Sequence, residues 1–262
     1  MVVVQAQGSR VATSPNPTPA ASQDGTTRPA GPPTATRVSW NAGHVTGEHI
    51  ATLLERAGLG GRVLPPAPAT LLLFNAEALD LVGVDDASVK GLSVYRYGDA
   101  QRAENAFALP PVQDPMHSTI SWVAKPYFVL VGDAIVNFGT DDAGAAGRLI
   151  DALTNPRVSA VGTVVEIADS TSPGFRRLTV TLAGRVEWPA SALAGTEVTL
   201  TTVPATAYVR TGGPAGSPSA ASSAVETFEE VGVRVGQSVA VTFIVGPETE
   251  AYVVLHLGNL MR

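Results

Sequence analysis

The chain contains no cysteine, and this absence excludes several kinds of site at once. Disulfides, zinc sites with thiolate ligands, iron–sulfur clusters and thiol nucleophiles all require that residue. Histidine is scarce as well, with 4 residues in a chain of 262, which leaves little for imidazole metal ligands or acid–base catalysis. The sequence therefore predicts neither a cofactor nor a metal site.

Basic residues are fewer than acidic ones. The chain has 17 Lys and Arg against 23 Asp and Glu, which gives a net charge of -6. Because affinity for nucleic acid comes mainly from basic side chains that neutralise phosphates, we expect no nucleic-acid partner. No stretch approaches the roughly 18 consecutive apolar residues of a membrane-spanning helix, so the sequence predicts no transmembrane segment in this chain.

Hydrophobic residues are nevertheless abundant, at 45% of the chain, so folded domains can bury ordinary cores. Residues 1–37 are different: they have no hydrophobic period and are rich in Pro, Ala, Ser and Thr, which predicts a disordered, semi-extended tail. Residues 1–8 are interpreted either as the stub of a signal peptide whose apolar region lies upstream, or as a plain tail.

Residues 38–156 combine helical and strand patterns and predict an α+β domain, an antiparallel sheet with two or three helices. Helices are expected after Thr46, after the capping Asp99 and after residues 140–142, with a break at Pro110. Apolar runs indicate strands at 71–74, 79–82, 89–97, 119–123, 127–131 and 134–138.

Residues 157–262 predict a small, OB-like β-barrel domain, because short alternating strands recur there and closure removes exposed sheet edges. Residues 212–223, which are rich in Gly, Ala, Ser and Pro, are expected to form a flexible loop within it. The alternating segments are 161–167, 178–182, 198–202, 239–245 and 253–257.

Two sets of side chains with possible chemistry are better explained by structure. His44 and His49 are five residues apart, not the four that place two zinc ligands on one helical face, and we interpret them as a solvated helix start. The paired carboxylates lack the spacing of a calcium loop and are interpreted as caps of turns and helices. These pairs are Asp85-Asp86, Asp141-Asp142 and Glu229-Glu230.

An aromatic group is the one candidate ligand site, made of Tyr95, Tyr97, Trp122 and Tyr127. Aromatic side chains with polar tips can line a ligand cleft, but a domain of this size also needs them for its core. Both interpretations stay open at the level of sequence.

Part of the first domain is similar to a known family. The segments Val94-Tyr-Arg-Tyr97, Ile120-Ser-Trp-Val123 and Ala134-Ile-Val-Asn-Phe138 resemble an uncharacterised family of bacterial exported proteins and lipoproteins, over about residues 47–153. The resemblance implies a secreted or membrane-tethered, extracytoplasmic protein whose signal sequence is missing from this chain. Residues 137–138 depart from the family's apolar-Tyr pairing, and the lipobox cysteine of a lipoprotein is absent.

The second domain has a resemblance of its own. Residues 206–210 and 228–243 are similar to the small OB-like barrels of secreted bacterial proteins, whose ligands are unknown. Neither resemblance brings a catalytic residue with it.

These observations lead to one functional hypothesis and two alternatives. The first is a non-catalytic exported accessory or binding protein of the bacterial cell envelope, with partner and ligand unknown. The second is a small-molecule or peptide binder that uses the aromatic cleft of the α+β domain. The third is an enzyme of unrecognised type, in which the fold brings together residues such as Glu104, Asp114 and His117.

Overall fold

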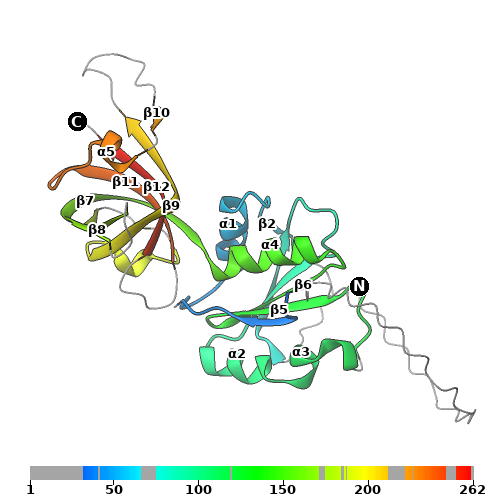
Figure 1. Ribbon diagram of the computed structural model, residues 1–262. Coiled ribbons are helices and arrows are strands. Elements are labelled where there is room, and N and C mark those ends of the chain that lie inside the picture. Colours follow the sequence, from blue (N-terminus) through cyan, green and yellow to red (C-terminus); the bar gives the residue numbers. More distant parts are fainter. Residues whose placement is uncertain are drawn as a thin grey trace, which may run out of the picture.

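A computed structural model of the chain contains two domains, a mixed sheet covered by helices and a closed β-barrel (Figure 1). The expected combination of an α+β domain with a small barrel is therefore confirmed. No helix in the described part of the chain is long and apolar enough to cross a membrane. The predicted disorder of residues 1–31 and the predicted strand at 71–74 lie outside the described residues. The structure describes residues 32–40, 42–65, 75–118, 120–170, 175–183, 186, 188–211, 222–225, 227–245 and 252–260.

The first sheet has six strands in the order β1-β5-β6-β4-β3-β2. Neighbouring strands are antiparallel except β1 and β5, which are parallel, so the sheet is mixed and not antiparallel as expected. The strands are β1 (Ala35–Arg37), β2 (Arg62–Leu64), β3 (Ala78–Gly83), β4 (Leu92–Arg96), β5 (Pro126–Val131) and β6 (Ala134–Gly139).

The tail was expected to extend to residue 37, but residues 35–37 form strand β1. Its three residues carry no strand signal of their own, and they are held in place by β5. The Phe128 N–H donates to the Thr34 carbonyl at 2.7 Å, and the Val38 N–H donates to the Leu130 carbonyl at 3.0 Å. The folded chain thus begins before residue 35, inside the proline-rich region.

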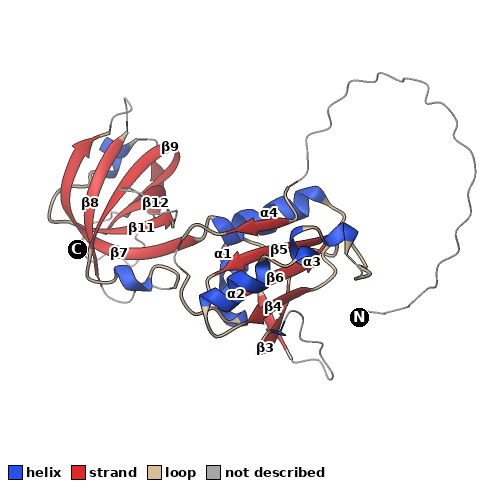
Figure 2. Ribbon diagram, turned by 90° about the horizontal axis from the view of Figure 1, so that it is seen from below, coloured by secondary structure: helices blue, strands red, loops and turns tan. Residues whose placement is uncertain are grey.

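Helices cover both faces of this sheet. Helices α1 (Gly47–Arg56) and α4 (Ala143–Thr154) lie on one side, and α2 (Ala100–Phe107) and α3 (Pro110–Gln113) lie on the other (Figures 1 and 2). The expected helix starts are confirmed, and the side chains of Thr46, Asp99 and Asp142 accept backbone N–H groups of α1, α2 and α4. The helix after Asp99 ends at Phe107, in agreement with the expected break at Pro110. Pro110 itself begins the separate short helix α3, because a proline at the first helical position loses no hydrogen bond.

The segment before β5 also differs from expectation. Residues 120–125 form no strand, and a short 3-10 helix, η2 (Pro115–His117), precedes them. The Trp122 indole N–H donates to the Pro115 carbonyl at 3.2 Å, and its ring meets the Phe128 ring edge-on at 5.6 Å. Trp122 is therefore fixed against the helical layer and does not extend the sheet.

The second domain is a closed barrel. Strand β7 follows α4 after residues 155–156 only, and closure comes from pairing of β8 with β9. The strands lie in the order β8-β9-β12-β11-β7. Strand β9 is parallel to β12, and helix α5 (Phe228–Val231) precedes β11. This arrangement is that of an OB-like Greek-key barrel. The strands are β7 (Arg157–Asp169), β8 (Arg176–Ala183), β9 (Glu197–Thr211), β11 (Ser238–Ile244) and β12 (Tyr252–Leu260); a short 3-10 helix, η3 (Ser191–Leu193), precedes β9.

The last two residues of the loop expected at 212–223 belong to a strand. Strand β10 (Ser222–Val225) pairs with the last residues of β9, and Ser222 faces Thr211. Residues 212–221 lie outside the described part of the chain.

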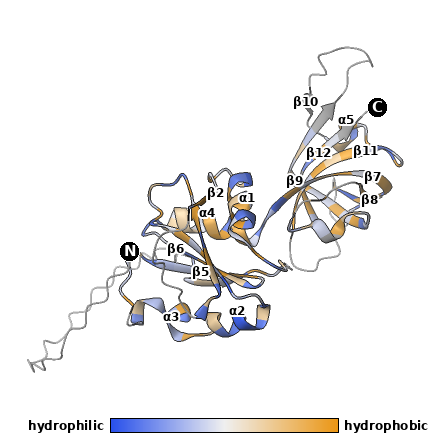
Figure 3. Ribbon diagram, turned by 180° about the vertical axis from the view of Figure 1, so that it is seen from behind, coloured by the Kyte–Doolittle hydropathy of each residue, from blue (hydrophilic) through white to orange (hydrophobic). Residues whose placement is uncertain are grey.

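Inward-facing residues of the barrel follow the alternation in β8, β9 and β11, as Leu178, Leu200 and Phe243 illustrate with no exposed area. In β7 the phase is the opposite of the pattern read from sequence. Val161 and Val165 are 44% and 42% exposed, while Val158, Ala160 and Val164 face the core. Figure 3 shows the hydrophobic segments along the strands of both domains and hydrophilic segments along α2.

Candidate functional site

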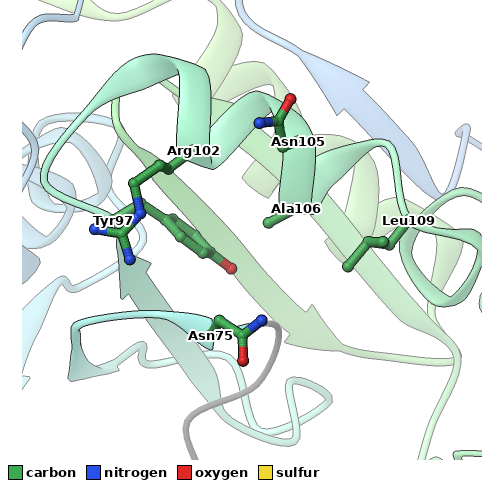
Figure 4. A pocket seen from close by; sticks show the side chains of 6 residues that line it. All are labelled: Asn75, Tyr97, Arg102, Asn105, Ala106 and Leu109. Atoms are coloured by element: carbon green, nitrogen blue, oxygen red, sulfur yellow. The ribbon is translucent and has the colours of Figure 1, made fainter.

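A pocket of about 260 Å³ lies between α2 and the residues at the end of β4 (Figure 4). Helix α2 and the residues after it supply positions 102, 105, 106 and 109, a spacing that places four side chains on one helical face. Tyr97, next to β4, forms the inner wall, and Asn75 faces the helix from the far side. The lining residues are Asn75, Tyr97, Arg102, Asn105, Ala106 and Leu109.

Tyr97 has the most unusual environment in the pocket. Its side chain is 1% exposed, yet its hydroxyl has no hydrogen-bond partner among the described residues. Figure 4 shows the hydroxyl directed toward the space between α2 and Asn75. Burial, followed by the neighbouring Tyr95, raises the pKa of Tyr97 above its ordinary value, so the group is a neutral phenol that can both donate and accept.

The other polar groups of the pocket carry no net charge. The Arg102 guanidinium forms an ion pair with Glu77, which lies just before β3. The Asn105 side-chain oxygen accepts from Gln101 at 3.1 Å, so its amide N–H groups remain available to a ligand. Asn75 is exposed and has a φ of 60°, a left-handed conformation that asparagine adopts more readily than most residues.

The structure divides the aromatic residues singled out from sequence between the two faces of the sheet. Tyr95, Tyr97 and Trp122 belong to the core beneath α2 and α3. Tyr127 lies on the opposite face, stacked on Phe138 at 5.3 Å between ring centroids. Of the four candidates, Tyr97 lines the pocket; Tyr95 lies beside it as a core residue whose pKa is raised by burial.

The paired carboxylates have structural partners. Asp85 and Asp86 form ion pairs with Arg62 and Arg148, each at 2.7 Å. Hydrogen bonds from Ser88, and then the contact with Arg148, hold the pKa of Asp86 below its ordinary value. Lys125 N donates to Asp141, Asp142 caps α4, Arg176 pairs with Glu229, and Glu230 completes the capping box of α5.

The three residues considered for catalysis do not form one cluster. Asp114 and His117 are paired, with 2.8 Å between a carboxylate oxygen and Nδ1, and both side chains are largely exposed. Glu104 is paired with Arg37 instead. In the described ranges no group of three His, Asp or Glu side chains is arranged to hold a metal ion.

Sequence reasoning missed three polar residues of the pocket, Asn75, Arg102 and Asn105. The helical pattern of α2 indicates the side that packs on the core, which carries Ala103 and Phe107. Arg102 and Asn105 share the spacing of Ala106 and Leu109, and this second stripe was the available signal. Asn75 follows a segment outside the described residues, and nothing in its sequence context indicated a pocket.

Comparison with known proteins places the chain in no family. No family model matches it, and no curated protein matches it. Among solved structures, a silver(I)-bound form of CusF from Escherichia coli matches 41% of this chain and 95% of its own, with 12% identity and a TM-score of 0.26. Its apo form matches 41% and 90%, with 12% identity and a TM-score of 0.24. Likeness at this level assigns neither a ligand nor an activity to the chain.

Proposed function

We propose that this protein is a non-catalytic binding protein that holds a small neutral molecule in the pocket between α2 and Tyr97. One observation carries the proposal: a fully buried hydroxyl faces a pocket of about 260 Å³ and has no partner among the described residues. An unsatisfied buried polar group costs about 1–3 kcal/mol, so such a group is retained where a ligand or solvent completes it.

The chemistry of the lining defines the ligand class. Tyr97 is a neutral phenol, Asn75 and Asn105 are amides, and the charge of Arg102 is compensated by Glu77. A ligand with an unpaired charge would lose hydration without gaining a counter-charge. We therefore infer a molecule that carries hydroxyl or amide groups, with a short apolar part against Ala106 and Leu109.

A thermal-shift screen of polyols, sugars, amides and nucleosides, with organic acids and amines as charged comparators, tests this proposal. We expect a neutral polar compound to raise the unfolding temperature of the wild type, because a ligand stabilises the state that binds it. Titration calorimetry then compares Tyr97→Phe with a matched control in the barrel, Tyr252→Phe.

The two variants separate binding from folding. In Tyr97→Phe the ligand-free stability does not fall, and rises by up to about 1 kcal/mol, because a buried unpaired hydroxyl is removed. Its affinity for the ligand is lost, whereas Tyr252→Phe binds normally. Equal binding by wild type and Tyr97→Phe, or no stabilisation of the wild type by any compound of the screen, contradicts the proposal.

We further propose that the protein acts outside the cytoplasm, as an exported accessory component of the bacterial envelope. The tail rich in Pro, Ala, Ser and Thr and the two sequence resemblances support this role. Fractionation of the native cells, with intact-mass measurement of the mature N-terminus, tests it. Recovery of the protein in the cytosol alone, with an unprocessed start, would overturn the proposed location without affecting the pocket.

A further inference from the structure

Trp188, in the connection between β8 and β9, joins the barrel to the α+β domain. Its indole N–H donates to the Ala42 carbonyl at 2.9 Å, and its own carbonyl accepts from Arg56 Nη1 at 3.1 Å. Its ring stacks on His49, with 4.5 Å between ring centroids and 10° between planes. It also meets Trp40 edge-on at 5.3 Å. One barrel side chain thus contacts several residues of the first domain.

These contacts matter because the covalent connection between the domains is short. Helix α4 ends at Thr154 and β7 begins at Arg157, so two residues join the domains along the chain. Trp188 supplies a second attachment, more than a hundred residues from its partners in sequence. We expect the barrel to keep one orientation while both attachments are in place, and to turn more freely about residues 155–156 when only the first remains.

His49 must be neutral for its present contacts. It is the third residue of α1, and its Nδ1 accepts the Thr46 N–H at 3.3 Å while its own N–H donates to the Thr46 hydroxyl. Nδ1 can accept only while it carries no proton, so the proton of the neutral ring is on Nε2. Protonation of Nδ1 would place two N–H groups against each other and break this capping box.

Burial and the neighbouring His44 oppose a proton on His49. Burial lowers the pKa of His49 below its ordinary value, and the neighbouring His44 lowers it further. Arg56, whose guanidinium contacts the Trp188 carbonyl, already places a cation at this interface. A hydrogen bond with the His44 backbone acts in the opposite direction, as do Glu48 and Asp133, but the Asp133 carboxylate is held by His44 Nδ1 at 2.6 Å and by the Val45 N–H at 2.8 Å.

We propose that Trp188 and His49 form a pH-dependent latch, which holds the barrel against the α+β domain while His49 is neutral and releases it when His49 is protonated. A cation on the face of a tryptophan is attractive in itself. The broken capping box, the cost of burying the charge and the repulsion from His44 outweigh that attraction. This inference concerns the domain interface and does not depend on the proposed ligand pocket.

The direction follows from proton linkage. Because the docked state has the lower pKa, it binds fewer protons, and docking is strongest above the ordinary histidine pKa of 6.5. As the pH falls below 6.5 toward the lowered pKa, the docking equilibrium weakens by up to about tenfold per pH unit, the limit for one proton.

Single-molecule energy transfer between two dyes on the full chain measures the opening. The chain has no cysteine, so Ala108→Cys on the first domain and Val235→Cys on the barrel give two unique labelling positions at exposed residues. We expect one narrow distance distribution at about pH 8 and a broader, longer one at about pH 5. Far-UV circular dichroism over the same range confirms that both domains stay folded.

Three variants identify the residues responsible. His49→Gln keeps the capping box, since glutamine suits the third helical position, but it takes no proton; its distribution stays narrow at both pH values. His44→Gln, at the exposed neighbour, still opens at low pH. Trp188→Ala gives the broad distribution already at about pH 8. The inference is overturned if His49→Gln opens like the wild type, if the wild type does not open, or if Trp188→Ala remains narrow.

Discussion

At the scale of single residues, the buried phenol of Tyr97 couples stability to high pH. In the unfolded chain tyrosine ionises near pH 10.0, whereas in the folded chain the pKa of Tyr97 is raised. The stability that depends on a neutral Tyr97 is therefore fully present below about pH 10, and it is lost as the pH rises toward the pKa of Tyr97 in the folded chain. Urea unfolding at about pH 8 and about pH 10.5 should show a smaller loss of stability for Tyr97→Phe than for the wild type. Equal losses would mean that Tyr97 ionises freely in the folded protein.

Individual residues were predictable from sequence only where local chemistry decided their role. Tyr97 was singled out because it is aromatic and alternates with Tyr95. The contact between His49 and Trp188 was not predictable, because no local pattern relates residues so far apart in the chain.

At the scale of elements, two glycines should respond oppositely to alanine. Gly162 lies in β7 where β8 passes closely: a Cβ there would be 2.8 Å from the Thr181 carbonyl oxygen and nearer still to Val180 Cγ1. Gly162→Ala should destabilise the barrel by about 1–3 kcal/mol, the usual result of overpacking. Gly147, within α4, has open space around it, so Gly147→Ala should stabilise the first domain by about 1 kcal/mol.

Urea unfolding of both glycine variants at neutral pH checks this pair. The helical variant serves as the matched control, because it adds the same methyl group where nothing opposes it. A barrel that accepts Gly162→Ala without loss would show that β7 and β8 can separate locally.

Helix starts were the most predictable elements, because a cap and an amphipathic stripe are both local in sequence. The phase of β7 was not, since valine occurs at adjacent positions 164 and 165 and fits either face. A shift by one residue exchanges the two faces of a strand, and only the neighbouring strands decide which is buried. Strand β1 was missed for the same reason, because β5 alone makes it a strand.

At the scale of the whole molecule, buried residues of both domains form one continuous hydrophobic cluster that includes Trp40 and Val186. We expect calorimetry of the wild type at about pH 8 to show a single unfolding transition. In Trp188→Ala the coupling between domains is weakened, and two transitions should separate. A single transition at the wild-type temperature in that variant would show that the domains are coupled elsewhere.

The strand order of the barrel also has a consequence for synthesis on the ribosome. Strand β12 lies between β9 and β11 and is the last of the barrel strands along the chain, so the barrel cannot close until β12 has emerged. The α+β domain is complete once α4 has been made, more than a hundred residues earlier. Because domains fold as units during translation, the first domain can present a finished surface before the barrel exists. Trp188 then meets partners that are already in position, and the nascent barrel strands assemble beside a folded neighbour.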